Sequence, residues 1–219
     1  MKKPTPPAAP AAPAARRPDA AAGETRERLL ACGEALARSR GFNGFSYADL
    51  AAAVGVRTAS IHYHFPTKAD LGLALVARYD ARYDAAMEAI ARETPDAARR
   101  VRAYAGLYLK GLEDNLGCLC AVLAASPDVL SLEMRAAVAA FFEKHVVWLA
   151  RVIEQGRADG TARPGAAAEP LARAIICLLE GALMMERLFD AHGFPRNGGA
   201  SGARSFEGAL AAVEREIAP

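Results

Sequence analysis

The chain has 219 residues, a formal net charge of +2, and 53% hydrophobic but only 7% aromatic residues. A charge so near zero excludes a protein that coats nucleic acid through a global positive field, so any DNA contact must come from a local patch. No stretch approaches the ~20 charge-free apolar residues of a membrane span. The four cysteines lack metal-ligand spacing, and we expect a cytoplasmic protein with reduced thiols. Abundant alanine with few aromatics favours helices.

Residues 1–22 consist largely of alanine and proline, and proline at this density cannot sustain a helix. We therefore expect a disordered or polyproline-like tail. Its basic residues leave two interpretations open: a passive leader, or an arm that contacts DNA phosphates beside the main DNA-binding element. These basic residues are Lys2, Lys3, Arg16 and Arg17.

A helix-turn-helix pattern occupies residues 46–65, after a first helix expected over about residues 24–39. Ser46 is placed as the N-cap of a short helix, and Gly55 follows where a left-handed turn favours glycine. A second short helix over residues 58–65 has an outward face that carries no acid. In a helix-turn-helix, this second helix enters the major groove of DNA.

Hydrogen-bonding and aromatic side chains cluster on this second helix and at the two helix starts that flank it. Hydroxyl groups and a threonine methyl can read base edges, and we expect Thr58, Ser60 and Tyr63 to be the leading contacts. Lys68 at a helix start suits a phosphate, as do the phenol and free N–H groups at the start of the first short helix. The alternative is a generic helical hairpin with a polar face. The candidate DNA contacts are Ser46, Tyr47, Arg57, Thr58, Ser60, His62, Tyr63, His64 and Lys68.

Residues 63–71, YHFPTKADL, resemble the end of the recognition helix and the step after it in the TetR family of bacterial transcriptional regulators. Gly41-Phe42 and the DLAAAVGV segment fit as well, and the resemblance is specific over about residues 24–84. Ala59 stands where the family often has glycine, and His62 where a phosphate-contacting tyrosine is common. The operator sequence therefore cannot be carried over from relatives. The resemblance implies a homodimer that binds double-stranded operator DNA and responds to a small-molecule effector.

The rest of the chain reads as a succession of helices, about nine in all, with no convincing strand. A long helix is expected to start near Lys68 and end before Pro95, with later breaks at residues 115–117, at 126–128 and in a glycine-rich loop over 193–202. We therefore expect an all-α fold. Its expected divisions are a tail (1–22), a helix-turn-helix DNA-binding domain (23–70) and a helical bundle for ligand binding and dimerisation (71–219).

The second half carries the expected effector pocket, which in the resembling family lies among the central helices. Mostly apolar walls with a few polar groups are typical of small-molecule sites. For each residue taken singly, ordinary core packing competes with a lining role. The lining candidates are Tyr104, Tyr108, Cys118, Phe141, Trp148, Glu180 and Met184.

Cys118 follows Gly117 at an expected helix start, where the helix dipole and free N–H groups would lower the pKa of the thiol. An electrophile- or oxidant-sensing repressor that uses this thiol is therefore one alternative. The other interpretation of Cys118 is a small, buried, apolar side chain.

No pattern in the sequence places a nucleophile beside a base, so we expect no enzyme, no cofactor and no metal site. The expected function is that of a ligand-responsive transcriptional regulator, a repressor released from its operator by a small molecule. Two further alternatives stay open: a ligand-independent accessory DNA-binding protein, favoured by a fully packed second domain, and a helical-bundle enzyme or carrier.

Overall fold

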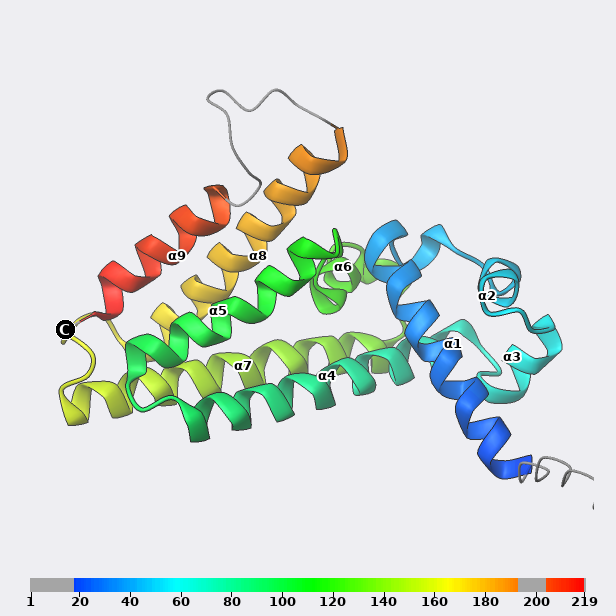
Figure 1. The fold of residues 1–219 in the computed structure, drawn as a ribbon, viewed down its shortest axis with the longest axis horizontal. Helices are drawn as coiled ribbons and strands as arrows, with labels where there is room; N and C mark the ends of the chain where they lie inside the picture. Colours follow the sequence, from blue (N-terminus) through cyan, green and yellow to red (C-terminus); the bar gives the residue numbers. More distant parts are fainter. Residues whose placement is uncertain (1–17, 193–203, 219) are drawn as a thin grey trace, which may run out of the picture.

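The computed structural model describes residues 18–192 and 204–218 (Figure 1). Within these ranges every secondary-structure element is a helix, and there is no strand. The expectation of an all-α fold is confirmed. The elements are α1 (Pro18–Arg40), η1 (Phe42–Gly44), α2 (Tyr47–Val54), α3 (Thr58–His64), α4 (Lys68–Glu93), α5 (Ala97–Glu113), α6 (Leu119–Ala124), η2 (Pro127–Val129), α7 (Leu132–Asp159), α8 (Ala168–His192) and α9 (Arg204–Ile217).

Two expected segments fall wholly or mostly outside these ranges. Residues 1–17 of the expected tail, with its basic side chains, lie outside the described residues, as does the expected glycine-rich loop over 193–202. Residues 18–22, which we expected in the tail, form the first part of α1. Within the described part of the chain, no helix is long and apolar enough to cross a membrane.

The elements α1, η1, α2 and α3 form a head at one end of the molecule (Figure 1). Leu29, Leu50, Ile61 and Phe65 make its core, and each is at most 2% exposed. α2 ends at Gly55, whose φ of 75° lies in the left-handed region that glycine adopts without steric cost. This turn directs the chain into α3 and leaves one face of α3 outside the core.

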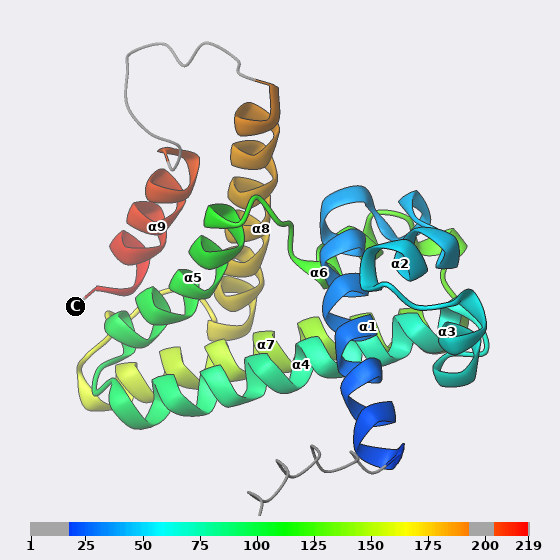
Figure 2. The same ribbon diagram turned by 45° about the vertical axis from the view of Figure 1, so that its right-hand side comes forward.

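α4 connects the head to the rest of the molecule. It starts with a capping box, in which Thr67 accepts a hydrogen bond from the Asp70 N–H and the Asp70 carboxylate accepts one from the Thr67 N–H. The helix then runs along α7 away from the head, as both views show (Figures 1 and 2). The predicted long helix from Lys68 to before Pro95 is confirmed.

The helices α5 to α9 pack with α4 around a second core, in which α8 contacts α5, α7 and α9. At the expected break at residues 126–128, Pro127 begins the short helix η2, and α7 starts after it at Leu132. The Ser131 side chain accepts a hydrogen bond from the N–H of Met134 and caps α7. α4 contacts both α1 of the head and α7, so it joins the head to this second core.

Candidate DNA interface and effector site

The outward face of α3 presents polar side chains that no neighbouring element covers. Arg57, Thr58 and His62 are exposed, Ser60 is half-buried, and Tyr63 is 77% exposed. No acidic residue lies on α3. This face can therefore approach the edges of DNA bases without repelling the phosphates beside them.

Ser46 and Tyr47 are engaged inside the head. The Ser46 hydroxyl lies 2.6 Å from the Asp49 carboxylate and caps α2. The Tyr47 hydroxyl lies 2.9 Å from the carbonyl oxygen of Phe65 and 2.6 Å from that of Thr67. Burial, with the nearby Asp70 carboxylate, raises the pKa of Tyr47 to about 12. This phenol therefore holds the corner between α3 and α4, and its role as a phosphate contact stays a prediction.

Lys68 is engaged in the same way. Its ammonium group donates a hydrogen bond to the carbonyl oxygen of Phe45 at 2.5 Å and lies over the rings of Phe42 and Phe45, 5.1 and 4.6 Å from their centroids. Burial lowers the pKa of Lys68. In this structure the charge packs against the head, and the expected phosphate contact of Lys68 stays a prediction.

The two histidines of α3 differ in their surroundings. The Nδ1 atom of His62 lies 3.2 Å from the carbonyl oxygen of Pro66, and its ring packs edge-on against Tyr47 at 4.9 Å. Burial and then the Arg26 charge lower the pKa of half-buried His64, which favours the neutral form of this side chain. Ala59 is also exposed on α3. It is not among the candidate DNA contacts, because these are selected for polar side chains.

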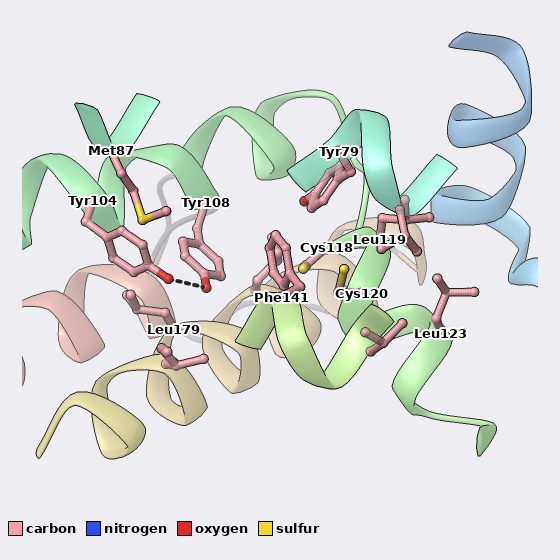
Figure 3. Close-up of a cluster of buried hydrophobic side chains, with 14 of the residues drawn as sticks. Tyr79, Met87, Tyr104, Tyr108, Cys118, Leu119, Cys120, Leu123, Phe141 and Leu179 are labelled. Carbon is pink, nitrogen blue, oxygen red and sulfur yellow. Dashed lines mark hydrogen bonds between the residues drawn. The ribbon is translucent and has the colours of Figure 1, made fainter. Parts of the chain in front are cut away.

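The candidate effector residues separate into three sets. Tyr104, Tyr108 and Phe141 form a buried aromatic core between α5 and α7, each at most 2% exposed (Figure 3). The Tyr104 hydroxyl lies 3.3 Å from that of Tyr108 and 2.8 Å from Nδ1 of His145. Burial lowers the pKa of His145 to about 4, and its Nε2 atom has no hydrogen-bond partner among the described residues.

The second set, Cys118, Glu180 and Met184, lines a groove of about 460 Å³ where the end of α1 meets α6 and α8. We call this space the junction groove. Arg38 and Arg187 also line it. It lies between the head and the helices of the second core, so a molecule bound there would touch both.

Trp148 stands apart from both sets. Its ring stacks on Tyr104 at 5.7 Å between centroids, but it lines a different groove of about 580 Å³ between α4 and α7. Among the described residues, none of the cavities we find encloses all seven candidates. The pocket expected as one site is thus divided into a packed core and two surface grooves.

Cys118 is buried and lines the junction groove beside Glu180. Burial raises the pKa of the thiol, and the negative charge of Glu180 raises it further. Burial also raises the pKa of Glu180 to about 7, and its Oε1 atom has no hydrogen-bond partner among the described residues. The expected lowering of the Cys118 pKa is wrong, because burial and a neighbouring carboxylate outweigh the dipole of the six-residue α6.

The sequence analysis missed the polar contacts that join α1 to α4. The carboxylate of Glu34, 5% exposed, accepts hydrogen bonds from Arg38 at 3.2 Å, Arg78 at 2.9 Å and Arg82 at 2.6 Å. An acid on the apolar face of a helix was the signal that could have identified Glu34. These four side chains fasten the head to the long helix.

Comparisons with known proteins agree with this architecture. The family described as "Bacterial regulatory proteins, tetR family" matches residues 29–75, and "Tetracyclin repressor-like, C-terminal domain" matches residues 97–196. The HTH-type transcriptional repressor NemR of Escherichia coli (strain K12) is 30% identical over 138 residues, which are 61% of this chain and 69% of NemR. The nucleoid occlusion factor SlmA of Marinomonas sp. (strain MWYL1) is 28% identical over 61% of this chain and 68% of its own length.

Two solved structures extend the match over most of the chain. A TetR-family transcriptional regulator from Agrobacterium tumefaciens is 30% identical, with a TM-score of 0.80 over 90% of this chain and 100% of its own. The reduced form of Escherichia coli NemR is 26% identical, with a TM-score of 0.76 over 89% of this chain and 97% of its own. With the two family matches and the exposed second helix of its helix-turn-helix, the chain belongs to the TetR family of bacterial transcriptional regulators.

Proposed function

We propose that this protein is a ligand-responsive repressor, which binds operator DNA as a homodimer and leaves it when a small molecule occupies the junction groove. The observation that supports DNA binding most directly is the exposed, acid-free face of α3 on a head whose core is fully buried. We assign it to the cytoplasm, where its DNA lies, and assign it no catalytic activity.

The side chains that extend from α3 define the proposed DNA contacts. Thr58 and Tyr63 would read base edges, since hydroxyl groups both donate and accept and the threonine methyl can contact thymine. Arg57 and His62 would contact bases or phosphates at either end of α3. Backbone N–H groups at the start of α2, next to Ser46, suit a phosphate oxygen. Two such heads in a dimer would contact half-sites about 34–36 Å apart.

The junction groove is the proposed effector site because it combines apolar walls with polar side chains of both charges. Cys118, Glu180 and Met184, three of the seven candidates, meet there. The buried Tyr104 and Phe141 belong to α5 and α7, and both of these helices pack against α8. Ligand would favour a conformation in which the two heads no longer match successive major grooves.

A ligand-independent accessory DNA-binding protein is a second candidate. The close packing of Tyr104, Tyr108 and Phe141 favours it, because a fully packed core leaves no space for a ligand there. One of the relatives, SlmA, is named a nucleoid occlusion factor and not a repressor.

Binding to operators selected from random duplexes tests the proposed function. Tyr63→Ala and Arg57→Ala should each weaken operator binding by about 1–3 kcal/mol without loss of the dimer, measured by fluorescence anisotropy at fixed salt. Arg151→Ala is the matched control for charge, since Arg151 is exposed near the far end of α7. If Arg57→Ala and Arg151→Ala bound the operator with equal affinity, Arg57 would not be a DNA contact. Failure to select any operator would contradict the function itself.

A further inference from the structure

Arg187 lies on the junction groove, where no described acidic residue pairs with it. Among the described residues, its guanidinium donates hydrogen bonds to two backbone carbonyl oxygens, that of Arg38 at 3.2 Å and that of Asn115 at 3.4 Å. No carboxylate of the described residues forms an ion pair with it, whereas the neighbouring Arg38 is paired with Glu34. Burial and the charge of Arg38 both lower the pKa of Arg187. Its positive charge is therefore not neutralised within the described part of the chain.

The backbone makes room for this guanidinium at one position. A Cβ atom on Gly117 would lie only 2.7 Å from Nη1 of Arg187 and 3.0 Å from Val122. Glycine at the turn before α6 thus allows Arg187 to reach the carbonyl oxygens of α1 and of the segment after α5. The groove is built around the guanidinium, with the apolar side chains of Val122, Leu183 and Met184 beside it.

Glu180 is the acidic residue that lines this groove, but it forms no ion pair with Arg187. It lines the groove beside Cys118, and its Oε1 atom is inaccessible to solvent. Since the pKa of Glu180 is about 7, the side chain is protonated in a large fraction of molecules at neutral pH. The accessible charge of the junction groove is consequently positive.

We propose that the junction groove binds an organic carboxylate, whose head group pairs with Arg187 and whose apolar body lies against Val122, Leu183 and Met184. A guanidinium matches a carboxylate in shape and forms charge-assisted hydrogen bonds with it, about twice as strong as those to neutral acceptors. The volume of about 460 Å³ suits a small molecule. This inference rests on the proposed function, since it names the class of the effector.

The same contact accounts for release from DNA. Arg187 of α8 donates a hydrogen bond to the carbonyl oxygen of Arg38 at the end of α1. The Arg38 side chain in turn donates hydrogen bonds to the carbonyl oxygen of Gly117 at 2.6 Å and to the Glu34 carboxylate. A carboxylate competes with the two backbone carbonyls for Arg187. When the guanidinium turns to the ligand, α1 loses its attachment to α8, and the head can move relative to the second core.

Three probe molecules share the same phenylbutyl group and differ only in the head group. They are 4-phenylbutyrate, 4-phenylbutanol and 4-phenylbutylamine. Calorimetric titration of the full-length dimer at pH 7 should show at least tenfold tighter binding of the carboxylate than of the alcohol. Arg187→Gln should reduce the carboxylate to the affinity of the alcohol. Arg173→Gln should not, because Arg173 lies on the same helix but is paired with Glu143 and Glu169.

Met184→Glu keeps the test valid if Arg187→Gln alters the fold. Met184 is 68% exposed, and a glutamate three residues before Arg187 on a helix would pair with it and exclude the carboxylate. Sedimentation should show that this variant remains a dimer. Glu180→Gln should leave carboxylate binding unchanged or stronger, since it removes a negative charge from the groove.

Several outcomes would overturn the inference. These are tightest binding by the amine, loss of binding in Glu180→Gln, equal binding in Arg187→Gln, or no binding of 4-phenylbutyrate at 5 mM. Operator affinity, measured on the same samples without probe, keeps the two proposals apart. A protein that binds its operator but not the carboxylate refutes only this inference, whereas one that selects no operator refutes the proposed function.

Discussion

At the scale of single residues, the Lys68 ammonium group is held by Phe45 O and by the rings of Phe42 and Phe45. Lys68→Met keeps the apolar stem and removes these contacts, so it should lower the free energy of unfolding by about 1–3 kcal/mol in urea denaturation. The salt dependence of operator binding should match that of the wild type if this charge stays with Phe42 and Phe45 when the protein binds DNA. A slope smaller by about 0.9 would show instead that Lys68 contacts one phosphate.

Glu180 makes stability depend on pH. Its pKa is about 7 in the folded protein and 4.5 in the reference state, so the folded protein retains the proton more strongly. The stability that this group contributes is fully present below pH 4.5 and is lost as pH rises to about 7. The difference in unfolding free energy, wild type minus Glu180→Gln, should therefore fall by roughly 3 kcal/mol from pH 4.5 to pH 8.

Urea denaturation of both proteins at several pH values measures this difference. The lowered pKa of His145 acts in the opposite direction, because its neutral form is preferred in the folded protein. Both proteins contain His145, so its effect cancels in the difference. A difference that stays constant over this pH range would mean that Glu180 titrates as an exposed carboxylate.

At the scale of helices, α5 and α7 come together at a glycine. A Cβ atom on Gly156 would lie 2.3 Å from Cβ of Ala97 and 2.9 Å from Cβ of Ala162. These neighbours are short and cannot turn away, so Gly156→Ala should separate the two helices and cost about 1–3 kcal/mol of stability. Gly106→Ala is the matched control within α5, because its Cβ would meet nothing within 4 Å.

The control should change stability in the opposite direction. Alanine is favoured over glycine inside a helix, so Gly106→Ala should raise the free energy of unfolding by about 0.5–1 kcal/mol. Both variants can be compared by thermal and urea denaturation. If Gly156→Ala were as stable as Gly106→Ala, the approach of α5 to α7 at this position would not restrict side-chain size.

Helix boundaries set by local signals could be predicted from the sequence, and contacts between distant residues could not. Ser46 and Gly55 define α2 through a cap and a turn that involve only nearby residues. The partners of Tyr47, by contrast, are 18 and 20 residues away, and that of Lys68 is 23 residues away. A polar residue that looks free in the sequence can therefore be engaged in the fold.

The same reason explains the effector residues. Helical spacing placed Tyr104 and Phe141 among apolar positions, but it could not tell a packed core from a cavity wall. The junction groove depends on how α1, α6 and α8 meet, and Arg187 became a candidate only through its contact with Arg38, 149 residues away.

At the scale of the whole molecule, α8 connects three features. It carries Arg187 at the junction groove, packs against α9 and exposes apolar side chains to the outside. Leu178, Met185 and Leu188 are 41%, 47% and 53% exposed. Their spacing of seven and three residues places them along one face of the helix. An exposed apolar face of this kind is typical of a surface that a second subunit covers.

We predict that this face of α8 forms the interface of the homodimer. A two-fold interface brings the same side chains of both protomers together, so Leu178→Glu should place two carboxylates in an apolar contact. Sedimentation velocity at micromolar concentration should show a monomer, and operator affinity should fall at least tenfold, because one head covers a single half-site. Val147→Glu is the matched control, since Val147 on α7 is 39% exposed and should leave the dimer intact. A dimer of Leu178→Glu with wild-type operator affinity would move the interface to another surface.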